Sequence, residues 1–290
     1  MTASVPVTVV VPAFNAAPYL AVTLQSLREQ TAVPERILLV DDGSTDDTVA
    51  VAESHGITCI RQSNSGPGAA RNRGLAAAET PFVAFLDADD WYAPDKLERS
   101  VTQLLNLGAA CVATDAWVVR GDRIDGRKND RRAVPVVLTL EMLLRGNPVV
   151  CSTVVARTEA VRQAGGFDES PDLVATEDYD LWLRMANREP LSYLPEPLTF
   201  YRAHTGSLSG NARFLRGVDR ILGRVGLNHP GEAHFENLIR QRRADVRLDL
   251  AWDLMQERRG DEARAMIAEA RALHRSWKSL RMKLRALLTR

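Results

Sequence analysis

The sequence has few cysteines and no net charge, and each of these features excludes a class of protein. The three cysteines among 290 residues are widely spaced, at Cys59, Cys111 and Cys151. They therefore predict buried free thiols rather than a disulfide framework or a zinc cluster. Lys and Arg number 37, as do Asp and Glu. This balance lacks the basic excess that is typical of proteins that bind nucleic acids.

Long apolar runs are also missing. No stretch approaches the ~18 residues of a membrane span, and the N-terminus has no basic region before its first apolar run, unlike a signal peptide. We therefore expect a cytoplasmic globular protein of about two domains.

The C-terminal segment departs from the even charge balance. No acid follows Glu269, whereas seven Lys or Arg residues lie within 271–290. Apolar residues step through the same segment by four and three positions: Leu273, Trp277, Leu280, Leu284 and Leu287. This pattern predicts a basic amphipathic helix. It either lies in an anionic membrane surface or docks its leucines on the preceding helices.

Short β-branched runs alternate with helical patterns over the first hundred residues. Strands are expected at 7–11, 37–40, 57–60 and 82–86, with helices at 18–30, 45–55 and 68–78. Such alternation predicts an α/β fold whose parallel sheet is covered by helices on both faces.

The rest of the chain divides into two further regions. Residues 106–210 continue the mixed pattern, with 120–133 expected as a mobile charged loop, and complete one domain with residues 1–105. Residues 211–290 have only helical patterns, and one hairpin of helices is expected to bury Leu248, Trp252 and Met255 on a common face.

Polar clusters follow three of the expected strands, at 12–15, 41–44 and 87–90. Ligands of open α/β sheets bind at the carboxyl ends of the strands. Two acids separated by one residue, as in Asp87 and Asp89, can supply one metal ligand and one ribose contact. An EF-hand is excluded because Tyr92 stands where that loop needs glycine. A haloacid-type phosphatase is disfavoured because Trp91 stands where a small hydroxylated residue is wanted.

Two further segments bear on chemistry. The turn 66–68 is glycine-rich and opens a helix, which is a weak indication of phosphate binding. Three acids, Glu177, Asp178 and Asp180, lie at the expected start of a helix. Either their negative charges are simply stabilised there by the helix dipole, or one of them supplies a general base.

The motifs together resemble family 2 glycosyltransferases over about residues 5–210. The segments that carry the resemblance are VVVPAFNAAPYLAVTLQSLREQT, ILLVDDGSTDDT, NSGPGAARNRGL, FLDADDWYAPDKL, GGFDE, TEDYDLWLR and YRAHTGSLS. The resemblance implies the GT-A nucleotide-sugar fold followed by a helical C-terminal extension.

The resemblance also implies roles for individual residues. The nucleotide would be bound by Pro12, Ala13, Asn15, Asp42, Arg71, Asp87 and Ala88. In this set, Asp42 contacts the uracil and Asp87 the ribose. Asp89 would bind Mg²⁺ or Mn²⁺, His204 would complete the metal site, and Asp178 would be the catalytic base.

The implied activity is inverting, metal-dependent transfer of one sugar from a nucleotide-sugar donor, and a UDP-linked sugar is the first candidate for that donor. The acceptor is a glycan, a lipid-linked glycan or a small molecule, as in cell-surface glycan assembly. Processive synthesis is disfavoured because the chain lacks membrane spans and a Gln-x-x-Arg-Trp segment after Asp178. A nucleotidyltransferase and a catalytically silent nucleotide-sugar-binding module remain as alternatives.

Overall fold

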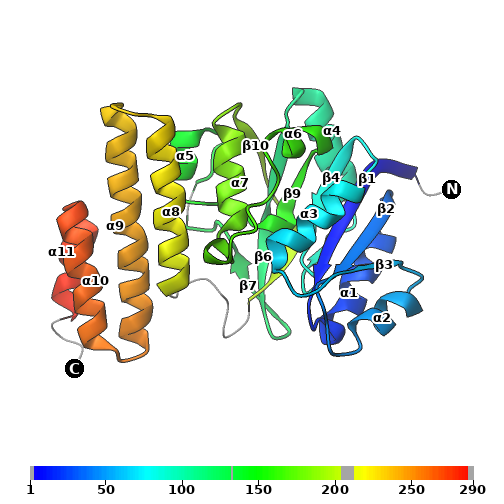
Figure 1. The fold of residues 1–290 in the computed structure, drawn as a ribbon, viewed down its shortest axis with the longest axis horizontal. Coiled ribbons are helices and arrows are strands. Elements are labelled where there is room, and N and C mark those ends of the chain that lie inside the picture. Colours follow the sequence, from blue (N-terminus) through cyan, green and yellow to red (C-terminus); the bar gives the residue numbers. More distant parts are fainter. Residues whose placement is uncertain (1–2, 132, 204–211, 287–290) are drawn as a thin grey trace. The chain divides into compact units, whose positions relative to one another are not determined.

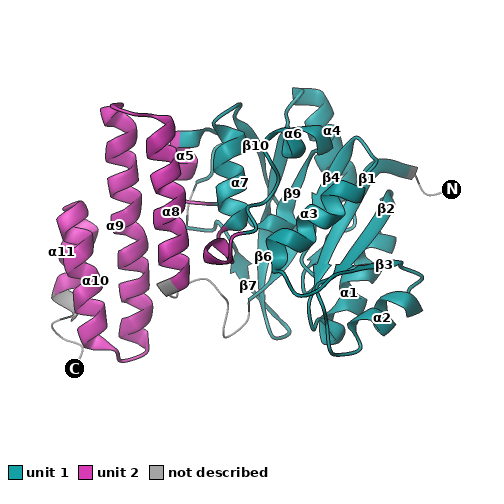
Figure 2. Ribbon diagram, viewed as in Figure 1, with its two compact units in different colours: residues 1–140, 148–169, 177–205 teal, residues 141–147, 170–176, 206–290 magenta. Residues whose placement is uncertain are grey.

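The computed structural model describes residues 3–131, 133–203 and 212–286 (Figure 1). His204 lies outside the described residues. The chain forms two compact units, coloured separately in Figure 2. Unit 1 comprises residues 1–140, 148–169 and 177–205, and unit 2 comprises residues 141–147, 170–176 and 206–290.

Within the described residues, ten strands form one sheet. They are β1 (Ala3–Ala13), β2 (Ala32–Asp41), β3 (Cys59–Arg61), β4 (Phe82–Phe85), β5 (Trp91–Tyr92), β6 (Cys111–Arg120), β7 (Arg123–Arg127), β8 (Val137–Leu138), β9 (Val154–Arg157) and β10 (Leu191–Arg202). The strand order is β3-β2-β1-β4-β9-β6-β10-β5, with β7 beside β6 and β8 beside β10.

The parallel pairing that was expected for the four strands of the first hundred residues is confirmed. β1 pairs parallel with both β2 and β4, and β2 pairs parallel with β3. β9 runs antiparallel to β4 and to β6, whereas β6 and β10 are parallel. The sheet is therefore mixed. The parallel order is broken at β9, which lies between β4 and β6 and runs antiparallel to both.

Helices cover both faces of this sheet. They are α1 (Ala17–Arg28), α2 (Thr48–Ser54), α3 (Pro67–Ala77), α4 (Lys96–Leu107), α6 (Thr158–Gln163) and α7 (Glu177–Ala186), with α5 (Leu140–Arg145) and the 3₁₀ turns η1 (Cys151–Thr153) and η2 (Pro171–Leu173) beside them in the chain. Val9 and Val11 of β1 join one core cluster with Leu24 of α1 and Leu104 of α4. Val10, on the opposite side of β1, meets α3 at Gly74. Alternation along one strand therefore supplies two helix-packing faces.

Unit 2 is helical in the described part of residues 206–290. Its helices are α8 (Ala212–Asn228), α9 (Ala233–Gln256), α10 (Gly260–Leu273) and α11 (Trp277–Ala286). Alanines at the contacts, such as Ala251 and Ala263, let α9 and α10 approach closely. Leu248 and Met255 are buried as expected, but Trp252 is 41% exposed, so its predicted place in the core is wrong.

The segment 120–133 is not the mobile loop that its composition suggested. Residues 123–127 form β7, which pairs antiparallel with β6. The hairpin turns at Gly121, whose φ of 57° suits glycine. The strand shows no alternation of apolar and polar residues, because both of its faces are solvent-exposed at most positions and carry charged side chains.

The C-terminal pattern is also interrupted. α10 ends at Leu273 and α11 begins at Trp277, so the apolar residues do not share one continuous helical stripe. Met282 of α11 is buried in the same core cluster as residues of α9 and α10, whereas Trp277 is 75% exposed. Lys278 pairs with Asp249 of α9 at 2.9 Å, which corrects the expectation that no acid offsets these cations. Side chains at Leu284 and Leu287 lie outside the described residues.

Two of the three cysteines, Cys111 and Cys151, are buried and free as expected, whereas Cys59 is half-buried. None of the helices in the described residues is both long and apolar enough to cross a membrane.

Candidate active site

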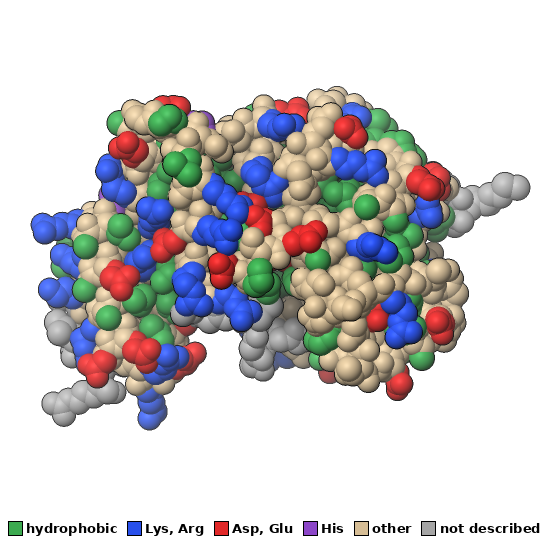
Figure 3. All heavy atoms as spheres, viewed as in Figure 1, with side chains coloured by type: hydrophobic (Ala, Val, Ile, Leu, Met, Phe, Trp, Pro, Cys, Tyr) green, Lys and Arg blue, Asp and Glu red, His purple; other side chains and the backbone are tan. Residues whose placement is uncertain are grey.

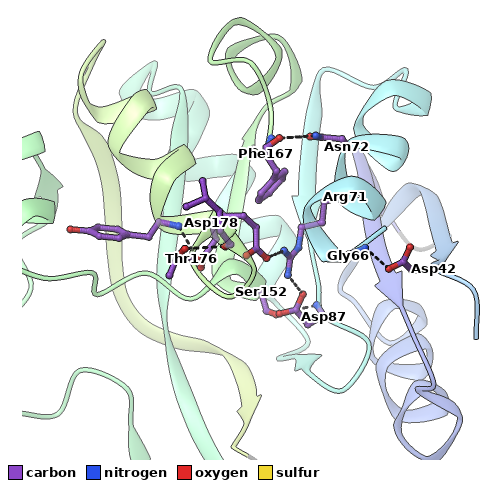
Figure 4. Close-up of polar contacts among 12 residues, drawn as sticks. Asp42, Gly66, Arg71, Asn72, Asp87, Ser152, Phe167, Thr176 and Asp178 are labelled. Atoms are coloured by element: carbon purple, nitrogen blue, oxygen red, sulfur yellow. Dashed lines mark hydrogen bonds and ion pairs between the residues drawn. The ribbon is translucent and has the colours of Figure 1, made fainter. Parts of the chain in front are cut away.

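The first polar cluster joins the ends of β1 and β2 to the turn before α3. Asp42 is buried and accepts hydrogen bonds from the backbone N–H groups of Ser65 and Gly66 and from Gln62 Nε2, at 2.8–2.9 Å. The Asp42 carboxylate thus accepts a hydrogen bond from Gly66, the first residue of the glycine-rich turn that the sequence associated with phosphate binding (Figure 4). Asp42 shapes this edge of the site, and its contact with a base stays a prediction.

The residues after β1 have different environments. Pro12 and Ala13 are buried, whereas Asn15 is exposed and adopts a left-handed backbone with φ 50°. Asn15 accepts a hydrogen bond from Thr45 N and donates its own N–H to Ser44 Oγ. This exchange fixes the loop after β1 to the loop after β2, where a ligand of the sheet would lie.

Arg71 of α3 is the buried centre of the second cluster. Its Nη1 donates to Glu177 Oε1 and its Nη2 to Asp87 Oδ1, both at 2.6 Å. Its guanidinium also lies 5.4 Å from the centre of the Phe167 ring. The end of β4 and the start of α7 are therefore joined through one side chain (Figure 4). The attraction between the three charges offsets part of the cost of desolvating them, and removing any one of them would leave its partners buried without a counter-charge.

Gly68 explains how α3 reaches this position. A Cβ atom there would stand 3.0 Å from the backbone oxygen of Asp168 and 3.5 Å from Glu177 Cγ. Close packing therefore requires a small residue at this point, independently of any ligand.

Three carboxyl groups gather after β4. Asp87 and Asp89 are partly exposed, whereas Asp90 is buried and accepts a hydrogen bond from Arg202 N at 2.8 Å. Burial, and then the charges of Asp89 and Asp87, raise the pKa of Asp90 well above its usual range. Ala88 is buried between them, and its carbonyl accepts a hydrogen bond from Thr23 Oγ1.

These carboxyl groups fit a divalent cation. Among the described residues, Asp90 Oδ2 is buried without a hydrogen-bond partner, and the mutual repulsion of three carboxylates is relieved by a nearby positive charge. In the same part of the chain, no three His, Cys, Asp or Glu side chains converge as a complete metal cage. A site that keeps waters and phosphate oxygens as further ligands suits Mg²⁺ or Mn²⁺.

Asp178 occupies the first turn of α7, and its carboxyl is half-buried. Its Oδ1 accepts the N–H of Tyr179 at 2.6 Å. Burial, followed by the charge of Glu177, raises the pKa of Asp178 to about 7, against the opposing effect of Arg71. Asp180, by contrast, is ion-paired with Arg184 of the same helix. The two acids that the sequence grouped together therefore have different environments.

Sequence reasoning missed parts of the site. Glu177 was expected as a helix-start charge or a general base, and its ion pair with Arg71 was not foreseen. Ser152 accepts the N–H of Asp87 at 3.1 Å through its Oγ, and nothing in the pattern around 149–156 marks it.

Residues 8–164 match the model of the family described as glycosyl transferase family 2. TuaG of Bacillus subtilis (strain 168), a predicted teichuronic acid biosynthesis glycosyltransferase, is 29% identical over 71% of this chain and 82% of its own length. WfaP of Escherichia coli is named as a UDP-Glc:alpha-D-GlcNAc-diphosphoundecaprenol beta-1,3-glucosyltransferase. It is 26% identical over 71% of this chain and 80% of its own length.

Solved structures share the fold at lower identity. Residues 1–349 of Staphylococcus aureus TarS match 97% of this chain and 88% of that chain, with a TM-score of 0.69 and 19% identity. TarS is also solved with UDP and with UDP-GlcNAc. The mannosyltransferase PcManGT of Pyrobaculum calidifontis, solved with GDP-Man and Mn²⁺, matches 99% of this chain and 81% of that chain, with a TM-score of 0.61 and 20% identity.

The mixed sheet, the carboxylates at its strand ends and the match of more than half of the chain lead to one conclusion: this protein belongs to the family 2 glycosyltransferases and is a glycosyltransferase with the GT-A type of fold.

Proposed function

We propose that the enzyme transfers a single sugar from a UDP-linked donor to an acceptor hydroxyl, with inversion at the anomeric carbon. The observation that carries this proposal is the environment of Asp178. Asp178 is half-buried and directly follows Glu177 of the Glu177–Arg71–Asp87 ion pairs, and burial raises its pKa to about 7. A general base is most effective when its pKa lies near the working pH.

The reaction is one displacement. The acceptor oxygen forms a bond to the anomeric carbon, the bond from that carbon to the diphosphate oxygen breaks, and the hydroxyl proton passes to the Asp178 carboxylate. Because the acceptor attacks opposite the leaving group, an α-linked donor gives a β-linked product. Arg71 hydrogen-bonds both to Glu177, the neighbour of Asp178, and to Asp87 at the proposed ribose position. Arg71 therefore fixes the proposed base relative to the proposed donor site.

Mg²⁺ or Mn²⁺ is the proposed cofactor, with Asp89 as its ligand from the described residues and His204 as the second ligand implied by the family resemblance. A bound cation neutralises negative charge that develops on the leaving diphosphate. The accumulation of carboxylates after β4 and the Mn²⁺ complex of PcManGT support this choice.

The UDP-linked donor rests on two similar proteins. TarS is solved with UDP-GlcNAc, and the name of WfaP specifies UDP-Glc. In this chain Pro12, Ala13, Asn15, Asp42 and Ala88 are the proposed nucleotide-binding residues, together with Arg71 and Asp87. The exposed Asn15 is the member of this set whose side chain a ligand reaches without displacing a buried contact.

The proposed acceptor is a glycan of the cell surface or its lipid-linked precursor, met at the cytoplasmic face of the membrane. The names of TuaG and WfaP support a glycan acceptor. In residues 271–283 the exposed side chains are Ala272, Arg275, Trp277, Lys278, Arg281 and Lys283. One aromatic ring among four cations fits an anionic lipid surface.

Asp178→Asn tests the proposal. The substitution keeps size and polarity but removes the base, so turnover should fall about 10²- to 10⁴-fold, while donor affinity changes by no more than a few-fold. The assay measures sugar transfer and nucleotide release with UDP-GlcNAc, UDP-Glc and GDP-Man, with and without Mn²⁺. Proton NMR of the product gives the anomeric configuration.

Glu189→Gln is the matched control because Glu189 is an exposed acid just beyond the end of α7. It should leave both turnover and affinity unchanged. Wild-type turnover by the Asp178→Asn enzyme would show that the base is elsewhere, and a retained anomeric configuration would exclude the single displacement.

A further inference from the structure

The acidic turn, residues 87–90 after β4, is held in place by two buried hydroxyl groups. Ser152 Oγ of η1 accepts the N–H of its first residue, Asp87, at 3.1 Å. Thr23 Oγ1 of α1 donates to the carbonyl oxygens of its second and fourth residues at 2.8 and 2.7 Å. The contact at the third residue, Asp89, comes from a different strand.

Arg202, the last residue of β10, binds the acidic turn at this third residue. Its Nε donates to Asp89 O at 3.1 Å, and its backbone N–H donates to Asp90 Oδ1 at 2.8 Å. Two successive residues of the turn are thus bound by a single residue. Arg202 lies 113 residues beyond Asp89 in the chain, so only the tertiary structure brings the two together.

Aromatic rings hold the guanidinium group of Arg202. Its central carbon lies 5.0 Å from the centre of the Tyr19 ring of α1 and 4.9 Å from the Trp91 ring of β5. Trp91 in turn stacks on Phe200 of β10, with ring centres 5.1 Å apart and ring planes at 6° to each other. Ring faces attract a guanidinium group and restrict the orientation of its plane. The direction of the Nε–H group is therefore set by rings from α1 and β5.

We propose that Arg202 is a positioning residue, which holds the backbone of Asp89 so that the Asp89 carboxylate is in place for Mg²⁺ or Mn²⁺. The inference rests on the proposed role of Asp89 as the metal ligand. The three carboxyl groups of the acidic turn repel one another, so donors must keep the turn closed before a cation binds. Hydrogen bonds behind a metal ligand fix its orientation and thereby change metal affinity. Arg202 acts through Asp89 and does not itself contact the metal.

Binding of Mn²⁺ alone to the full chain measures this effect, with electron paramagnetic resonance reporting the free ion. Arg202→Met removes the Nε–H group and the charge. Arg202→Lys keeps the charge but lacks the planar group that donates to Asp89 O. Both substitutions should weaken Mn²⁺ binding about 10-fold. Wild-type affinity in both variants overturns the inference. Tighter binding by Arg202→Met also overturns it, because Arg202 would then act only by repelling the cation.

Arg157→Met is the matched control. Arg157 is half-buried like Arg202, its Nε donates to Ala109 O at 3.1 Å, and its guanidinium lies 5.7 Å from the centre of the Phe82 ring. It pairs with the first residue of β4, whereas the acidic turn lies beyond the last residue of that strand. Arg157→Met should lower stability in urea unfolding as Arg202→Met does, but should leave Mn²⁺ affinity unchanged. Equal weakening of Mn²⁺ binding by both methionine variants would show a general structural effect and overturn the inference.

A second variant changes the rings and leaves Arg202 in place. Tyr19→Leu removes one of the two ring contacts of the guanidinium group, so it should weaken Mn²⁺ binding by about 2- to 5-fold. Wild-type affinity in Tyr19→Leu overturns the inference if the Arg202 variants do not fold.

Asp89→Asn separates this inference from the proposed function. It should abolish Mn²⁺ binding, and wild-type affinity in Asp89→Asn would reject the proposed metal ligand and the role of Arg202 with it. The same holds if the wild type binds no Mn²⁺. Loss of binding in Asp89→Asn together with wild-type affinity in the Arg202 variants would reject only the role of Arg202. In the transfer assay, saturating Mn²⁺ should return kcat of Arg202→Met to within about twofold of the wild type.

Discussion

Two ion-paired arginines, one in each compact unit, have different environments. In unit 1, Arg71 is 6% exposed and joins Glu177, also 6% exposed, to Asp87. In unit 2, the pair of Arg259 with Glu262 has half of each side chain or more in water. Figure 3 shows charged side chains over the described surface of both units. Surface pairs of this sort contribute little stability. A buried set of charges, held at strand ends, is where function is expected.

The same contrast extends to the packing of helices. In unit 1, α3 approaches β1 through Gly74, where a Cβ atom would stand 2.3 Å from Val10 Cγ1. In unit 2, a Cβ atom at Gly223 of α8 would meet only Arg243 Nη2, at 3.8 Å. α3 is thus tightly packed at Gly74, whereas α8 has room for a methyl group at Gly223.

Removing the buried cation should have the largest effect. Arg71→Met leaves Glu177 buried and Asp87 partly buried without their partner, so the free energy of unfolding should fall by about 3–5 kcal/mol. Arg259→Met in unit 2 removes only exposed ion pairs and should leave the free energy of unfolding close to the wild-type value. Urea unfolding of both variants measures the difference. Equal losses would remove the contrast between buried and surface charges.

Two glycine-to-alanine substitutions, one in each unit, should change the free energy of unfolding in opposite directions. Gly74→Ala forces a methyl group against Val10 and should destabilise the protein by about 1–3 kcal/mol. Gly223→Ala adds the same methyl group to a half-buried helix position that has room for it, and should stabilise the protein by about 0.5–1 kcal/mol. Thermal or urea unfolding of the two alanine variants gives both signs, and destabilisation by Gly223→Ala would contradict the open packing of α8.

The smallest expected effect concerns the exposed side of α11. The full chain should co-sediment with vesicles that contain phosphatidylglycerol and not with neutral phosphatidylcholine vesicles. Each cation near an anionic surface contributes about 1 kcal/mol, so Arg281→Gln with Lys283→Gln should weaken binding several-fold, as should high salt. Arg216→Gln with Arg240→Gln removes two exposed cations from α8 and α9 as a control. Equal binding to both kinds of vesicle, or to neither, would rule out an electrostatic membrane contact.

The sequence predicted much of the α/β order because its signals are local. Val7–Val11 and Phe82–Leu86 are runs of a few residues, and both lie in strands. The polar residues after them were expected at one edge of a sheet, because that follows from parallel pairing. β7 was missed because its five residues contain one apolar side chain, and pairing with β6 rather than burial makes it a strand.

What the sequence by itself determined is therefore the family, the alternation of elements and the carboxylates Asp42, Asp87, Asp89 and Asp178 as candidates for chemistry. Only the tertiary structure decided how those carboxylates are partnered. Arg71 and Glu177 are 106 residues apart in the chain, and no spacing rule connects them. Helical periodicity likewise placed Trp252 and Trp277 on apolar stripes, but a periodic pattern states which residues share a face and not whether another helix covers it.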